Sequence, residues 1–123
     1  MRSFKTKAFA RRARQEGISD KQLHEAVERA ARGLIDAELG GGLIKQRVAR
    51  PGQGRSGGFR TIIAWRAKDR SIFVYAFAKN MRDNISDAEL ADLKDLAVLY
   101  LGYSSKEIDR AVAAGELFEV NLS

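Results

Sequence analysis

Basic side chains stand in the middle of the sequence at spacings that could bring them together on a phosphodiester. Lys45 and Arg47 lie two residues apart in a predicted strand, Arg60 opens a second, and Lys79 and Arg82 follow a third. If the three strands are neighbours, these cations converge on one rim of a sheet. Cleavage of RNA requires a base at the 2′-oxygen, positive charge around the developing phosphorane and an acid at the 5′-oxygen. Clustered Lys and Arg supply the positive charge, whereas spacing alone identifies neither the base nor the acid.

The charge of the chain is unevenly distributed. The net charge is +6 and the isoelectric point is near 9.9, yet residues 1–60 carry 14 basic and 6 acidic side chains while residues 61–123 carry 8 and 10. Residues 43–60 hold five basic side chains, Arg50 and Arg55 among them, and no carboxylate. Because such a cluster repels itself, it favours a polyanionic partner, either nucleic acid or an acidic protein surface. The alternative is a solvated basic face that aids solubility.

A glycine-rich stretch separates the first two of these strands. Residues 52–57 match the pattern G-x-G-x-x-G, but a dinucleotide site needs that pattern between a strand and a helix, and here a strand follows. We therefore reject a dinucleotide site. The stretch is interpreted as a connection whose backbone can approach a phosphate closely, with Arg50 and Arg55 beside it. The alternative is a surface loop with no ligand.

The composition gives little support for a metal site, a disulfide framework or nucleophilic catalysis. The chain has no Cys and a single His, His24, so a disulfide framework, a thiol nucleophile and a metal site are not expected. A Ser-His-Asp constellation would have to recruit His24, which we expect on a helix flank. The carboxylates near Asp87 and Glu89 fill the first turn of a predicted helix, where the macrodipole favours them. No cofactor is predicted.

The segments before residue 43 and after residue 85 are predicted to be mainly helical. Residues 1–7 could form an edge strand, and helices are expected over residues 8–16 and after the capping box at Ser19. The second helix has an apolar stripe of Leu23, Val27, Ala30 and Leu34. Arg29 and Arg32 are expected to lie off this stripe. The glycines at 33 and 40–42 close this segment. Two further capping boxes, at Ser86 and Ser104, begin helices that end at Gly102 and Gly115.

The middle of the chain is predicted to be a sheet. Residues 43–50 alternate, which places Ile44 and Val48 on one face and Lys45 and Arg47 on the other. Strands over residues 59–66 and 71–78 are close in sequence and should be antiparallel. Residues 116–120 form a short tail that could be a strand. The predicted order, β-α-α-β-β-β-α-α, indicates an α+β fold with helices segregated from an antiparallel sheet.

Length and hydropathy limit the class of protein. The 123 residues fit one domain spanning 1–123. No apolar run approaches the roughly 20 residues that cross a bilayer, and no apolar segment follows the basic residues near Met1 as in a secretory signal. We therefore expect a cytoplasmic protein with no membrane partner.

Two long motifs resemble the RelE-like toxins of the RelE/ParE superfamily. The first is Arg-Pro-Gly-Gln-Gly-Arg-Ser-Gly-Gly-Phe-Arg-Thr at residues 50–61, and the second is Ile-Phe-Val-Tyr-Ala-Phe-Ala-Lys-Asn-Met-Arg-Asp-Asn-Ile at residues 72–85. They are similar to the RelE-type branch found in bacteria and in phage-derived genes, whose fold agrees with the predicted order of elements. The resemblance implies the toxin of a type II toxin–antitoxin pair, with a cognate antitoxin as partner and with mRNA and the ribosome as targets.

The resemblance also assigns roles to individual residues. It implies that Arg60 is a catalytic, phosphate-contacting residue, with Lys79 and Arg82 in the basic cluster after the central strand, and that Lys45 and Arg47 act in RNA binding. Two positions depart from the pattern: residues 83–86 contain no Tyr or His, and Asn80 stands where an Arg is common. Two other functions therefore stay open, a ParE-like poison of DNA gyrase and a nucleic-acid-binding module without catalysis.

Overall fold

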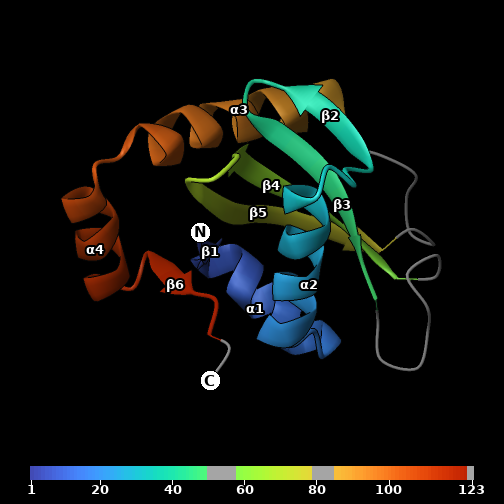
Figure 1. Ribbon diagram of the computed structural model, residues 1–123, viewed down its shortest axis with the longest axis horizontal. Helices are drawn as coiled ribbons and strands as arrows, with labels where there is room; N and C mark the ends of the chain where they lie inside the picture. Colours follow the sequence, from blue (N-terminus) through green and yellow to red (C-terminus); the bar gives the residue numbers. More distant parts are fainter. Residues whose placement is uncertain (50–57, 79–84, 122–123) are drawn as a thin grey trace.

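The computed structural model describes residues 1–49, 58–78 and 85–121, which form one mixed sheet with helices on both of its faces (Figure 1). The elements are β1 (Arg2–Thr6), α1 (Lys7–Glu16), α2 (Asp20–Ala31), β2 (Ala37–Gly40), β3 (Leu43–Val48), β4 (Phe59–Arg66), β5 (Arg70–Ala78), α3 (Asp87–Gly102), α4 (Ser105–Ala113) and β6 (Leu117–Glu119). The α+β class is therefore confirmed.

The sheet has the strand order β2-β3-β4-β5-β1-β6. The prediction of an antiparallel sheet is wrong for one pair, β1 and β5, which are parallel. β1 is not an edge strand: it pairs with β5 in parallel and with β6 in antiparallel fashion. Ser3, Phe4 and Thr6 are all buried, as an inner strand requires. The side-chain pattern of such a short strand specifies its burial but not its direction, which is why the sequence did not predict this pairing.

Each face of the sheet carries its own apolar core. On one face α1 and α2 pack against side chains such as Ile44, Phe59 and Phe73. On the other face α3 and α4 pack against Phe4, Ile62 and others. The alternation predicted for residues 43–50 is confirmed, because Ile44 and Val48 lie in the first core. Lys45 and Arg47 consequently point to the face that carries α3 and α4.

The helix boundaries follow their capping residues. The capping boxes at Ser19, Ser86 and Ser104 are all formed, with each Ser hydroxyl accepting from the backbone N–H three residues later. The predicted stripe of the second helix extends too far, however, since α2 ends at Ala31 and Leu34 is 58% exposed. The chain turns after Ala31, and Leu34 lies beyond the last helical turn.

The glycine run at residues 40–42 makes a hairpin turn, and the strand β2 before it was not predicted. All three glycines have positive φ, between 62° and 82°. A Cβ on Gly41 would lie 2.8 Å from Cγ of Lys94 in α3, and one on Gly42 would lie 2.9 Å from Cδ1 of Leu101. The run therefore allows both the tight turn and the close approach of α3.

An exposed ion pair ties β1 to β6 and gives a test of the fold. Arg2 donates two hydrogen bonds to Glu119, at 3.0 and 3.1 Å, and these bonds lower the pKa of Glu119. A carboxylate with a lowered pKa stabilises the fold above its unfolded pKa of about 4.3, and this contribution is lost as the pH falls through the folded value. We expect Glu119→Gln to lower the free energy of unfolding at pH 7 by about 0.5 kcal/mol, because the pair is solvent-screened.

Urea denaturation of both proteins between pH 7 and pH 3 would measure this effect. The difference between them should shrink as the pH falls below the unfolded pKa of Glu119 and through its lowered folded pKa. Glu25→Gln, on the exposed face of α2, is the control and should follow the wild type at every pH. A difference for Glu119→Gln that stayed constant with pH would contradict the ion pair as its cause.

Candidate nucleic-acid interface

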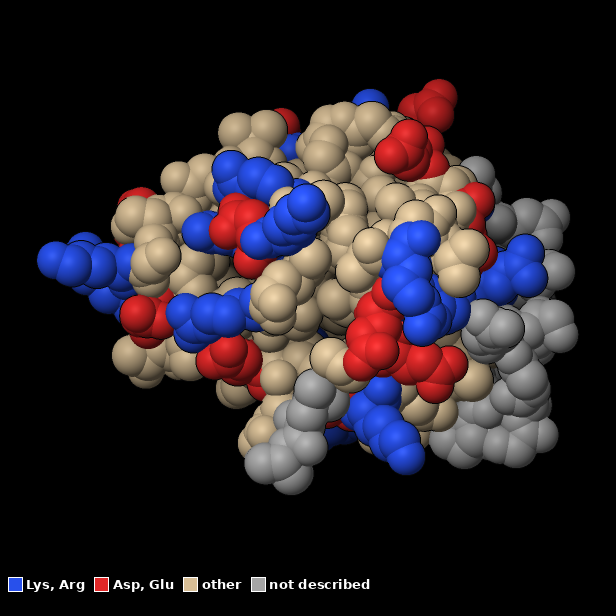
Figure 2. Space-filling model, viewed as in Figure 1, with Lys and Arg blue, Asp and Glu red and all other residues tan. Residues whose placement is uncertain are grey.

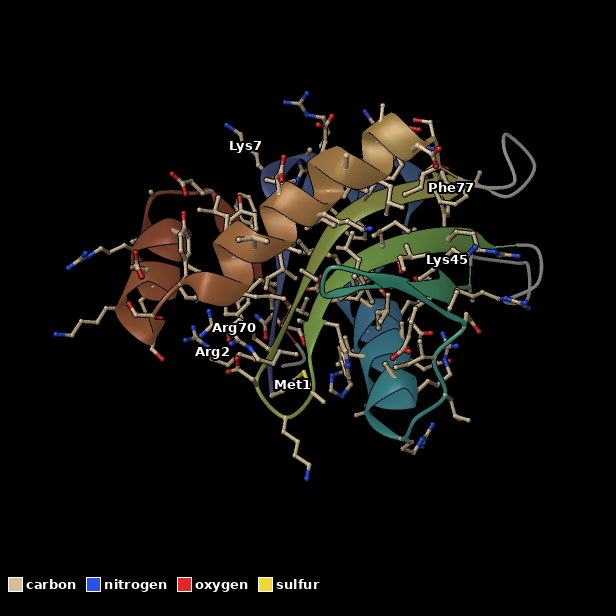
Figure 3. All side chains as sticks on the ribbon, turned by 90° about the horizontal axis from the view of Figure 1, so that it is seen from above. Met1, Arg2, Lys7, Lys45, Arg70 and Phe77 are labelled. Carbon is tan, nitrogen blue, oxygen red and sulfur yellow. The ribbon has the colours of Figure 1, made fainter. Side chains whose placement is uncertain are left out.

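Three of the predicted cations share one face at one end of the sheet. β3 and β4 pair so that Arg47 lies directly opposite Arg60 and Lys45 lies opposite Ile62. Across the other ladder, Arg60 lies opposite Phe77 of β5. Figure 3 shows Lys45 and Phe77 at the same end of the sheet, on the side that α3 crosses. The alternating register thus brings Lys45, Arg47 and Arg60 together, and we refer to these three residues as the cation face.

The backbone hydrogen bonds of Arg47 show that Arg47 and Arg60 form the more closely spaced kind of cross-strand pair. Its backbone N–H donates to Oδ2 of Asp36 at 2.7 Å, and its carbonyl accepts from Nη2 of Arg29. Both backbone groups therefore point away from β4. Such a residue forms a non-hydrogen-bonded pair with its neighbour, in which the Cα atoms are about 4.5 Å apart rather than about 5.5 Å. Two like charges opposite each other at this spacing destabilise a sheet.

Arg60 is the most buried member of the cation face. Only 7% of the residue is exposed, and its Nη1 finds no hydrogen-bond partner among the described residues. Burial lowers the pKa of its guanidinium below the ordinary value, the charge of Arg47 lowers it further, and Asp36 acts in the opposite direction. A buried guanidinium donor without an acceptor costs free energy, and an anion bound at Nη1 would recover it.

Side chains from outside the sheet fix the position of Arg47. Asp36, between α2 and β2, also places Oδ2 3.8 Å from Nε of Arg47. The backbone N–H of Asp36 donates to Oε1 of the fully buried Gln46 at 2.8 Å. Arg29 reaches Arg47 from α2 and is only 7% exposed, so the prediction that it falls off the buried stripe is wrong. A long side chain on the flank of the stripe can still be buried when a carbonyl on a neighbouring element accepts from it.

Neither Asp36 nor Arg29 was predicted as part of this region. Asp36 follows a helix in a segment without periodicity, and Arg29 sits among ordinary helix charges. Only the contact of α2 with β3 gives them a role. Four further predicted residues, Arg50, Arg55, Lys79 and Arg82, lie outside the described residues, as does the glycine-rich motif at residues 52–57.

The remaining candidate residues lie elsewhere. His24 pairs with Glu28 one turn along α2, and both line a cavity of about 560 Å³ between α2, β2 and the β4–β5 turn. Glu89 accepts from the backbone N–H of Ser86 in its capping box and from the hydroxyl of Tyr75 at 2.8 Å. The described part of the chain contains no group of three or more His, Cys, Asp or Glu residues arranged to hold a metal ion.

On the face shown in Figure 2, basic and acidic side chains lie next to one another. Among the ion pairs of the described residues, Arg2 lies 3.0 Å from both Glu119 and Asp109. Two adjacent guanidinium groups that share a single nearby carboxylate in the part of the chain that the structure describes, Asp36, are therefore a more specific feature than the net charge. Among the helices of the described ranges, none has both the length and the apolar character of a membrane span.

Comparison with protein families gives one match. A family model described as the RelE toxin of the RelE/RelB toxin–antitoxin system matches residues 1–120, which is nearly the whole chain. No curated protein and no solved structure matches significantly. The matched range includes every element of the sheet and the whole cation face.

Proposed function

Since the chain belongs to the RelE toxin family, whose members are toxins paired with an antitoxin, we propose that it is a ribosome-dependent mRNA endonuclease that stops translation. In this proposal Arg60 stabilises the charge of the transition state, and Lys45 and Arg47 hold phosphates of the RNA. Lys79 and Arg82 join Arg60 in catalysis. Arg50 and Arg55 join in RNA binding.

The observation that best supports the proposal is the pair of Arg60 and Arg47. A fold gains nothing in stability from two guanidinium groups placed opposite each other, one of them buried with a donor left unpaired. Features that cost stability are common at functional sites. A phosphate that bound between the two groups would turn both costs into favourable interactions.

The chemistry required of such a pair is well defined. When the 2′-oxygen of RNA attacks the neighbouring phosphorus, negative charge accumulates on the non-bridging oxygens of the phosphorane. Donors that are already in place stabilise this charge without having to reorganise. Arg60 is held in place by burial between β3 and β5, and the backbone of Arg47 is held by its bonds to Asp36 and Arg29. The guanidinium of Arg60 is therefore in place before the substrate arrives, and the more exposed side chain of Arg47 extends from a fixed backbone.

The antitoxin partner is expected to act on the same face. An acidic segment laid over Lys45, Arg47 and Arg60 would neutralise their charge and block access of RNA. A segment that folds as it binds could cover this surface while remaining displaceable.

Induced expression in a bacterium, followed by mapping of mRNA 5′ ends, would test the proposal. We expect growth arrest within one generation and new 5′ ends inside coding regions that are being translated. Lys106→Ala removes one exposed charge on α4, far from the cation face, and should give the same pattern. A DNA-damage response without new 5′ ends would instead indicate a gyrase poison. Salt-sensitive RNA binding without growth arrest would indicate a binding module.

A further inference from the structure

One carboxylate lies against the cation face and is fixed there by the backbone. Asp36 accepts from the N–H of Arg47 at 2.7 Å, and its own N–H donates to Oε1 of Gln46 at 2.8 Å. Gln46 is fully buried and also donates to the carbonyls of Ala26 and Leu34. The carboxylate therefore belongs to a connected network and is not a freely rotating surface group.

The charge of Asp36 acts on both arginines of the pair. Oδ2 lies 3.8 Å from Nε of Arg47, within the range of an ion pair. Its field also opposes the effects of burial and of Arg47 on the guanidinium of Arg60. Among the described residues, Asp36 is the carboxylate paired with Arg47, and no ion pair is formed by Arg60. One negative charge thus offsets the repulsion between two positive charges.

A phosphate would compete with this carboxylate. RNA binds Lys and Arg through phosphate oxygens, and an arginine already paired with a carboxylate offers fewer free donors to them. The side chains of Arg47 and Asp36 are 46% and 28% exposed, so solvent and ligand can reach the pair. The contact at 3.8 Å is long for a charge-assisted hydrogen bond, which makes it easy to displace.

We propose that Asp36 is a positioning residue that serves as the internal counter-ion of Arg47 and Arg60. In the free protein it stabilises the fold by offsetting the repulsion between the two guanidinium groups. In the same way it limits the affinity of the cation face for RNA, because phosphate has to displace it from Arg47. This inference rests on the proposed function only in taking RNA as the ligand.

Binding of a fluorescent single-stranded RNA oligonucleotide, measured by anisotropy at 50 to 300 mM salt, tests the proposal. We expect Asp36→Asn to tighten binding about threefold at low salt, the size typical of one partly exposed ion pair. The slope of log affinity against log salt should become steeper by about 0.7, because without the carboxylate the full charge of Arg47 is available to neutralise a phosphate. The melting temperature should fall by about 3 °C, because the counter-charge is lost.

Three variants separate this effect from a change in net charge or in structure. Asp95→Asn, on the exposed face of α3, adds the same charge elsewhere and should leave the salt slope unchanged. Asp36→Glu keeps the carboxylate and should retain the wild-type slope. In an Arg47→Ala background, Asp36→Asn should no longer steepen the slope, because the arginine that it releases is absent. Circular dichroism at the binding temperature shows whether each variant is folded.

Two results would overturn the inference. One is weaker or unchanged RNA binding in Asp36→Asn, as expected if Asp36 only supported the structure. The other is an equal gain in affinity for Asp36→Asn and Asp95→Asn, which would show an effect of net charge alone. Because the measurement is of equilibrium binding, it does not depend on cleavage. If the wild type proves unable to cut mRNA while Asp36→Asn binds more tightly, the proposed function fails and this inference stands.

Discussion

Replacement of Arg60 by methionine is expected to abolish toxicity while leaving the protein folded and slightly more stable. Methionine preserves much of the aliphatic volume between Arg47 and Phe77 but removes the guanidinium. In the proposed reaction this removes a fixed donor to the phosphorane. Loss of one such donor lowers the rate of comparable reactions by about 100-fold or more. New mRNA 5′ ends should fall below detection after induction, and growth should continue.

The gain in stability follows from the environment of Arg60. Its guanidinium is buried, lies opposite a like charge and leaves Nη1 without an acceptor among the described residues. Replacement of a buried ionic group by an apolar one of similar shape is often neutral or stabilising. We expect the free energy of unfolding to rise by about 1 kcal/mol, measured by urea denaturation. A loss of function combined with a gain in stability is typical of a functional residue.

Two further variants complete this test. Arg60→Lys keeps a positive charge but loses the planar fork of donors, so most of the activity should be lost. Lys106→Ala controls for the loss of one charge and should remain toxic. If Arg60→Met were fully toxic, the assignment of Arg60 to the reaction would be wrong. If Arg60→Met were inactive because it unfolded, the denaturation curve would show it.

The second large effect is expected at Gln46, whose side chain holds the surroundings of the cation face together. It accepts from the N–H of Asp36 and donates to the carbonyls of Ala26 and Leu34. Gln46→Leu would fill the same space and leave these backbone groups without their partner. Each buried group left without a hydrogen bond costs about 1–3 kcal/mol. Because two of the three bonds reach only partly buried groups, we expect the free energy of unfolding to fall by about 3 kcal/mol in total.

Thermal and urea denaturation would measure this loss. Gln15→Leu, on the exposed face of α1, is the matched control and should change stability by less than about 0.5 kcal/mol. The RNA affinity of Gln46→Leu should also change, because Asp36 is no longer fixed beside Arg47. Wild-type stability in Gln46→Leu would show that water satisfies these groups and that the network does not hold Asp36.

The sequence predicted those parts of the fold that depend on local pattern. Alternation over residues 43–50 predicted which side chains of β3 face each side of the sheet, and the strands over 59–66 and 71–78 are confirmed with their antiparallel pairing. The three Ser capping boxes predicted where α2, α3 and α4 begin. All of these signals act over a few residues, and the packing of the whole protein does not override them.

The parts that the sequence did not predict depend on distant contacts. β2 forms because Ala37 and Glu38 pair with β3 across the glycine turn, in a segment without strand periodicity. Burial of Arg29 depends on a carbonyl of β3, and the position of Asp36 depends on Gln46. For the cation face, the sequence supplied Lys45, Arg47 and Arg60. The position of the Asp36 carboxylate beside these cations, and the hydrogen bonds that hold Arg47, follow only from the way α2 packs against the sheet.

The place of β1 in the sheet bears on how the chain folds during its synthesis. β1 is made first, yet the strands on either side of it are made much later: Ser3 bonds to Ser71, 68 residues away, and Arg2 bonds to Glu119, 117 residues away. Large separations of this kind are typical of slowly folding topologies. A nascent chain that has not yet reached β5 leaves both edges of β1 without partners. Fragments that end before β6 therefore cannot complete the sheet, and we expect them not to be toxic.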